Sequence, residues 1–143
     1  RSNNEFKWLI CLEGADSKSF KALKSMCRFI DTDNDIVHGV HIETGNKKCD
    51  DSHPVKKVFV EEMEKYEVKN SDFSFIERED GEDNLTLHQL LLKWIKNHLK
   101  EETNYIDFII LGYNPTKYIN KPTENTTVDL LKSELVPNVY FDH

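Results

Sequence analysis

Side chains that could bind a metal ion or act on a substrate gather in a few short stretches of the sequence. Cys49, Asp50, Asp51 and His53 lie within one segment of five residues. Zinc sites in proteins usually need four fixed ligands at regular spacings, and the whole segment from 45 to 53 is polar. We therefore interpret residues 49–53 as part of a solvated loop and predict no metal site.

The other histidines do not converge either. His38 and His41 fall on one predicted strand, and residues three apart on a strand point to opposite faces. We interpret both as core or rim residues. His88 and His98 lie ten residues apart on a predicted helix, and we expect them at surface or edge positions.

No residue set with the spacing of a known catalytic apparatus is present. The sequence lacks a Gly-x-Ser-x-Gly elbow and a glycine loop followed by Lys-Ser or Lys-Thr. None of the cysteines has a histidine placed to act as its base. We predict that the chain is not an enzyme and has no catalytic residues.

Alternating apolar segments predict the elements that would position a site. Residues 8–12 and 106–111 are unbroken apolar runs, typical of strands buried on both faces of a parallel sheet. Thr86 and Gln89 form a capping box, and Pro54 suits the first turn of a helix. The expected strands are 8–12, 35–42, 72–77, 106–111 and 139–141, and the expected helices are 20–30, 54–66, 86–99 and 126–134.

Strands that alternate with helices in this way favour a mostly parallel sheet with helices on both faces. Ligands of such sheets bind beyond the carboxyl ends of the strands, where the strand order reverses. The two most apolar strands should be central. Their ends would place Glu13 and Gly14 beside Gly112, so any site is expected there.

Two short motifs resemble the universal stress protein family. The segment from Leu12 to Asp16, leading to Ser19-x-x-Ala22-Leu23, is similar to its opening strand, turn and helix, and residues 107–112 resemble its fourth strand. The resemblance spans nearly the whole chain in element order. The length of 143 residues fits one domain over 1–143, in which we expect 1–5 to be a disordered extension. The implied fold is a Rossmann-like (adenine nucleotide alpha hydrolase-like) three-layer α/β sandwich with a five-stranded parallel sheet and helices on both faces.

Many members of that family bind ATP through a glycine-rich loop after the fourth strand. The matching spacing here is Gly112-x2-Pro115-x9-Asn125-Thr126, in which Pro115 offers no N–H and Asn125 tolerates a left-handed conformation. Glu13 stands where the family has an aspartate that contacts the nucleoside. The residues that the resemblance implies for nucleotide binding are Glu13, Gly14, Ile42, Gly112, Pro115, Asn125, Thr126 and Thr127.

Three outcomes stay open for this site: intact binding of ATP with Mg²⁺, weak or altered binding of an adenine nucleotide, and no binding. Lys117 and Lys121 are the cations of the loop. The first interpretation is a non-catalytic stress or signalling module with a degenerate nucleotide site. The second is a scaffold that acts by dimerisation alone, and the third is a nucleotide-hydrolysing enzyme.

The charge and composition of the chain limit which partners and which cellular location we expect. The 143 residues carry 19 Lys and Arg against 26 Asp and Glu, for a net charge of −7, which repels nucleic acid. No apolar run approaches the roughly 20 residues of a membrane span, and we expect no signal peptide. Three cysteines without a CxxC pair suit a reducing compartment, so we predict a cytoplasmic protein. The segment from Asn138 to Asp142 suits an edge strand that could pair two copies in a homodimer.

Overall fold

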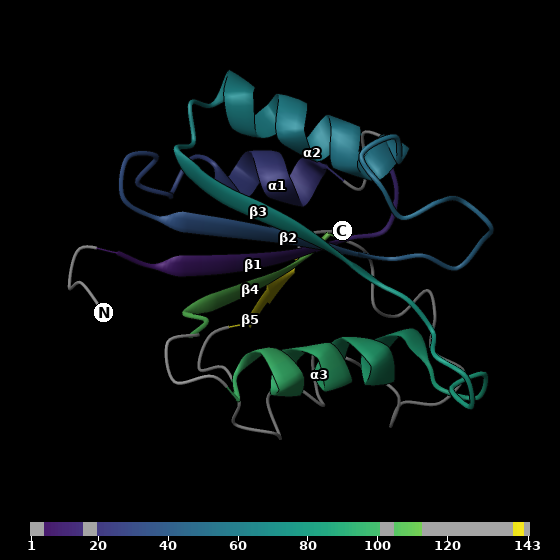
Figure 1. The fold of residues 1–143 in the computed structure, drawn as a ribbon. Helices are drawn as coiled ribbons and strands as arrows, with labels where there is room; N and C mark the ends of the chain where they lie inside the picture. Colours follow the sequence, from purple (N-terminus) through teal and green to yellow (C-terminus); the bar gives the residue numbers. More distant parts are fainter. Residues whose placement is uncertain (1–4, 16–19, 101–104, 113–138, 142–143) are drawn as a thin grey trace.

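The computed structural model describes residues 5–15, 20–100, 105–112 and 139–141. Strands and helices alternate along them (Figure 1). The strands are β1 (Lys7–Leu12), β2 (Ile36–Ile42), β3 (Asn70–Ile76), β4 (Phe108–Gly112) and β5 (Val139–Phe141), and the helices are α1 (Lys21–Met26), α2 (Pro54–Lys65) and α3 (Leu87–His98). The predicted helix at 126–134 lies outside the described residues.

All strand pairs are parallel, in the order β3-β2-β1-β4-β5. The α/β class and the parallel sheet are as predicted. β1 lies between β2 and β4, and Trp8 through Leu12 are all buried. A strand enclosed on both faces and both sides leaves its backbone groups no partner but the neighbouring strands. The short β5 pairs with β4 from Val139 onward.

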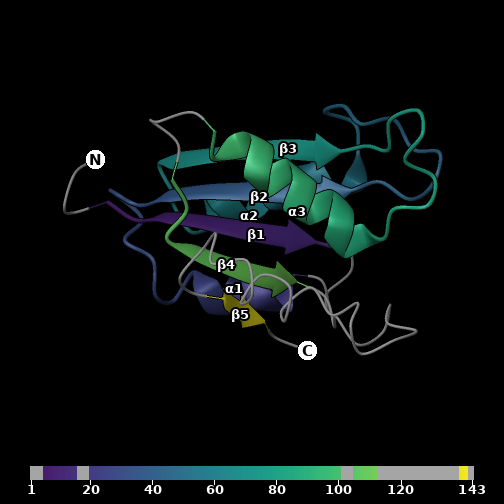
Figure 2. The ribbon, with the colours of Figure 1, turned by 90° about the horizontal axis from the view of Figure 1, so that it is seen from below.

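Helices cover both faces of the sheet (Figures 1 and 2). α1 and α2 lie on one face and α3 on the other. Alternate residues of β1 divide between two apolar cores: Trp8, Ile10 and Leu12 pack on the side of α1 and α2, whereas Leu9 and Cys11 pack on the side of α3. This division is the period of two that a strand imposes on its side chains.

The local signals predict the starts of α2 and α3 well and the end of α1 poorly. Thr86 and Gln89 form the predicted capping box at the start of α3, and α2 begins at Pro54. α1 is shorter than its apolar spacing predicts and ends at Met26. The chain continues there with tighter i−3 hydrogen bonds, from the Phe29 N–H to the Met26 carbonyl among others, and these still keep Ile30 buried.

Two contacts tie β1 to its neighbours at the amino end of the sheet. The buried Asp35 accepts hydrogen bonds from the Phe6 and Asp31 N–H groups and from the Trp8 indole. On the other side, Lys7 and Asp107, 100 residues apart, exchange two hydrogen bonds of 2.8 and 2.9 Å. None of the described helices is long and apolar enough to span a membrane.

Gly39 in β2 allows α2 to lie close to the sheet. A Cβ atom built at Gly39 would lie 2.7 Å from the Phe59 ring of α2 and 2.9 Å from the Phe73 ring of β3. Such distances are well inside van der Waals contact, so only glycine permits this approach. The close approach fixes the height of α2 over β2, and with it the position of the start of α2.

We therefore expect Gly39→Ala to destabilise the fold by about 1–3 kcal/mol, the usual cost of overpacking a core. Urea unfolding followed by circular dichroism measures it. Gly45→Ala is the matched control, because a Cβ there would meet only a Glu43 oxygen at 4.0 Å. Equal stability of the two variants would contradict the close approach of α2.

Candidate functional site

The carboxyl ends of β1 and β4 meet as the sequence predicts. Leu12 pairs with Gly112, so the backbone that continues into Glu13 and Gly14 leaves the sheet beside the end of β4. The connections that follow β1 and β2 carry helices on one face, whereas α3 precedes β4 on the other face. The strand order therefore reverses between β1 and β4, which is where parallel sheets bind ligands.

The predicted site residues divide into three groups. Glu13, Gly14 and Gly112 lie at this reversal, and the first two are half-buried. Ile42, the last residue of β2, is buried in the core on the α3 side. Pro115, Asn125, Thr126 and Thr127 lie outside the described residues, as do Lys117 and Lys121, so the loop spacing stays a prediction.

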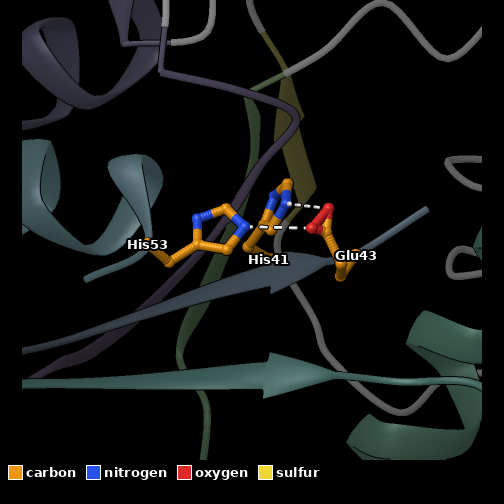
Figure 3. A group of neighbouring side chains, drawn as sticks. All are labelled: His41, Glu43 and His53. Atoms are coloured by element: carbon orange, nitrogen blue, oxygen red, sulfur yellow. Dashed lines mark hydrogen bonds and ion pairs between the residues drawn. The ribbon is translucent and has the colours of Figure 1, made fainter. Parts of the chain in front are cut away.

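A second polar cluster, which the sequence analysis missed, lies at the same edge of the sheet over β2 (Figure 3). His41 is the penultimate residue of β2, Glu43 follows the strand, and His53 caps the start of α2. His53 Nε2 lies 3.0 Å from Glu43 Oε2, and His41 Nε2 lies 3.8 Å from Glu43 Oε1. One ligand atom from each of the three residues lies within 4.8 Å of the other two.

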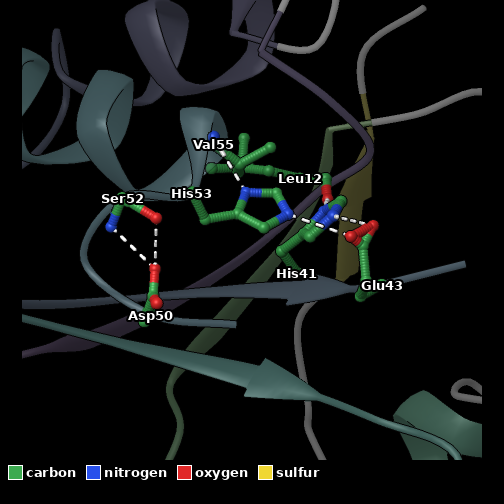
Figure 4. Close-up of polar contacts among 7 residues, drawn as sticks. All are labelled: Leu12, His41, Glu43, Asp50, Ser52, His53 and Val55. Atoms are coloured by element: carbon green, nitrogen blue, oxygen red, sulfur yellow. Dashed lines mark hydrogen bonds and ion pairs between the residues drawn. The ribbon is translucent and has the colours of Figure 1, made fainter. Parts of the chain in front are cut away.

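Backbone contacts determine which ring nitrogens carry protons (Figure 4). His41 Nδ1 lies 2.7 Å from the Leu12 carbonyl, which only accepts, so Nδ1 carries hydrogen and donates. His53 Nδ1 accepts the Val55 N–H at 3.1 Å. A neutral imidazole has one N–H and one lone pair. His53 therefore has its hydrogen on Nε2 and donates a hydrogen bond to Glu43. His41 has its lone pair on Nε2.

The charges in the cluster follow from burial and from these bonds. Burial lowers the pKa of His41, and it outweighs the Leu12 contact and the Glu43 carboxylate, which raise it. Burial alone would raise the pKa of Glu43, but the hydrogen bonds from His53 and the Gly45 backbone bring that pKa below its usual value. At neutral pH the cluster therefore holds an ionised Glu43 carboxylate beside a neutral His41 imidazole.

The interpretation of residues 49–53 as a solvated loop is right for part of the segment and wrong for His53. Asp50, Asp51 and Ser52 are exposed, and Asp50 accepts hydrogen bonds from the Ser52 N–H and hydroxyl (Figure 4). His53 is only 2% exposed. The signal that could have found it is its place directly before Pro54, because the residue before a helix-starting proline is a capping position.

The remaining histidines form separate contacts. His38 and His41 do lie on opposite faces, since His38 packs against Trp94 and His98 on the α3 side and His41 against His53. His98 also stacks on Trp94 and contacts Lys7 Nζ at 2.9 Å. The surface or edge position expected for His88 is wrong, because it is 6% exposed and contacts the Thr86 hydroxyl.

None of the three cysteines is a reactive thiolate. All are free thiols. Burial raises the pKa of Cys11 to about 12 and that of Cys27 to about 11, in each case with help from a nearby glutamate. Burial, followed by a hydrogen bond with Glu77, raises the pKa of Cys49 to about 11. A thiol that stays protonated at neutral pH is a poor nucleophile.

A groove of about 440 Å³ lies between β3 and α3. Its charged walls pair with one another, because Lys93 is ion-paired with both Glu79 and Glu82. Arg78 is bound to the backbone carbonyls of Glu82 and Leu85. These charged groups are therefore already paired within the protein, and the groove presents none of them unpaired to a ligand.

Comparison with known proteins places the chain in no family: no family model, no curated protein and no solved structure matches it.

Two replacements of His53 should show how much its capping hydrogen bond contributes to stability. We expect His53→Ala to cost more stability than His53→Asn by about 1 kcal/mol, because asparagine keeps a side-chain acceptor for the Val55 N–H. Both variants lose the donor to Glu43, so that term cancels in the comparison. Guanidinium unfolding curves of the two variants measure the difference, and an Asn variant no more stable than the Ala variant would contradict the cap.

His38 should make stability fall in weak acid. Burial, together with the charges of Lys7 and His98, lowers the pKa of His38 to about 4, whereas an unfolded histidine has a pKa near 6.5. Between these values only the unfolded chain binds the proton. The free energy of unfolding should therefore decrease by roughly 3 kcal/mol from this residue as pH falls through that window.

The measurement is urea unfolding from pH 7 to pH 4 for the wild type and for His38→Gln. Carboxylates titrate in both proteins, so the difference between their slopes isolates His38. The variant should show the shallower dependence on pH, and parallel slopes would mean that the folded and unfolded chains bind the His38 proton over the same pH range.

Proposed function

We propose that the chain is a non-catalytic domain of the universal stress protein type, which binds an adenine nucleotide with Mg²⁺ between the ends of β1 and β4. The observation that carries the proposal is the pairing of Leu12 with Gly112 at the reversal of strand order. The parallel sheet with helices on both faces supports the fold that the resemblance implies. That fold is Rossmann-like (adenine nucleotide alpha hydrolase-like) and has a five-stranded parallel sheet.

Each residue has a role in this proposal that its chemistry suits. Gly112 lets phosphate approach the backbone closely, and the hydroxyls of Thr126 and Thr127 complete the contact. The Glu13 carboxylate accepts hydrogen bonds from nucleoside hydroxyls. Mg²⁺ offsets the repulsion between the phosphates and a chain of net charge −7.

Function would then follow from a population shift. A nucleotide that binds one arrangement of residues 113–127 more tightly than another changes the surface offered to a partner. β5 lies at the edge of the sheet, so pairing of the segment from Asn138 to Asp142 with a second copy would extend the sheet into a homodimer. The three free thiols support a reducing compartment such as the cytoplasm.

The test is a calorimetric titration of the chain with ATP and Mg²⁺, with ADP and AMP as comparisons. We expect saturable binding to the wild type and none to Gly112→Val, because a β-branched side chain beside Glu13 blocks the approach of phosphate to the backbone. Gly45→Val is the matched control, since a Cβ there would meet only a Glu43 oxygen at 4.0 Å, and it should bind as the wild type does.

Circular dichroism establishes that both variants are folded. Binding that survives Gly112→Val would overturn this site. If the wild type binds no nucleotide, the nucleotide-binding function is wrong and the interpretation as a scaffold that acts by dimerisation remains. Release of phosphate from ATP in the same samples would favour the interpretation as a nucleotide-hydrolysing enzyme.

A further inference from the structure

We propose that His41 and Glu43 bind a divalent transition-metal ion such as Zn²⁺, and that His53 holds the carboxylate in place for it. The site lies over β2, one strand away from the β1–β4 ends. It goes beyond the proposed nucleotide function and does not depend on it.

The first argument is that two hydrogen-bond acceptors face each other. The Leu12 carbonyl accepts a hydrogen bond from His41 Nδ1–H, so in the neutral ring the lone pair is on Nε2. The Nε2 atom lies 3.8 Å from Glu43 Oε1, and the two side chains are 6% and 11% exposed. Acceptors placed so near each other with little access to water repel unless a cation or a donor lies between them.

A proton on His41 is the poorer way to satisfy this pair. The 3.8 Å separation between His41 Nε2 and Glu43 Oε1 is too long for an N–H···O hydrogen bond. A metal ion has no such difficulty. Zinc bonds of about 2.0–2.2 Å place two ligands of a tetrahedral ion about 3.4 Å apart, so a shift of a few tenths of an ångström closes the site.

Backbone bonding makes His41 a prepared ligand. Metal-binding histidines usually donate their second ring N–H to a carbonyl or carboxylate, which fixes the ring and its tautomer. The 2.7 Å contact to Leu12 is an interaction of this kind. Because Leu12 ends the central strand β1 and His41 pairs with it in β2, the ring is held by the centre of the sheet.

His53 acts as a positioning residue rather than a ligand. Its only lone pair accepts the Val55 N–H, and its Nε2–H donates to Glu43 Oε2 at 3.0 Å. That bond leaves Oε1 to face His41. Within the described part of the chain, no further histidine, cysteine or carboxylate joins these three, so the remaining coordination positions are open to water or a small ligand.

The ligand types determine which metal fits. Imidazole nitrogen with carboxylate oxygen suits Zn²⁺, Co²⁺ or Ni²⁺, whereas Mg²⁺ and Ca²⁺ prefer oxygen ligands alone. Titration of Zn²⁺ into the metal-stripped chain, without nucleotide, should show saturable binding to one site. Mg²⁺ should show none.

Matched histidine and glutamate variants locate the ion. His41→Gln and Glu43→Gln should each weaken Zn²⁺ binding at least tenfold, because each removes a ligand while keeping a side chain of similar size. His98→Gln, at the separate histidine pair on the α3 side, should leave it unchanged. Circular dichroism confirms folding. Absence of Zn²⁺ binding to folded wild type, or loss of binding in His98→Gln alone, would overturn the site.

The role of His53 has its own readout. His53→Asn keeps a capping acceptor but no donor of the same reach to Glu43, and we expect a tenfold to hundredfold loss of Zn²⁺ affinity, as for other residues that orient ligands. Nitrogen NMR of labelled protein should show zinc on His41 Nε2 and a retained proton on His53 Nε2. Loss of the His53 proton on addition of zinc would overturn the assignment and make His53 a ligand.

Discussion

The enclosure of β1 is the constraint on which the rest of the structure depends. Its side chains are buried on both faces of the sheet, and its backbone pairs with β2 on one side and β4 on the other. A parallel strand of this kind needs a crossover before each neighbour can join it. The helices, the two cores and the meeting of strand ends at Glu13 and Gly112 all follow from that requirement.

A second consequence appears at the end of β2. Gly39 lets α2 approach the sheet until Phe59 fills the space that a side chain would occupy. The start of α2 is thereby brought over the strand, so a capping residue becomes a neighbour of a strand residue. His53 serves the helix with one ring nitrogen and Glu43 with the other. One side chain thus links the geometry of a helix to the orientation of a carboxylate.

The sequence predicts the elements because their signals are local. The apolar run of β1, the capping box at Thr86 and the proline at the start of α2 each depend on a few adjacent residues. The meeting of His41 with His53 depends on the height of a helix over a sheet, which no spacing records. The polarity of residues 44–53 predicts a solvated loop, although their last member, His53, is buried. The motifs of the resemblance lie at the ends of β1 and β4 and predict nothing about the end of β2.

The hydrogen bonds between Lys7 and Asp107 join residues 100 positions apart, and this separation bears on how the chain folds. β1, β2 and β3 are consecutive in sequence and adjacent in the sheet, so they can assemble from local units. The second side of β1 stays unpaired until β4 arrives. During synthesis from the amino end, this apolar strand is therefore a temporary edge of the sheet. The time needed to bring Asp107 to Lys7 determines how long that edge is exposed to aggregation.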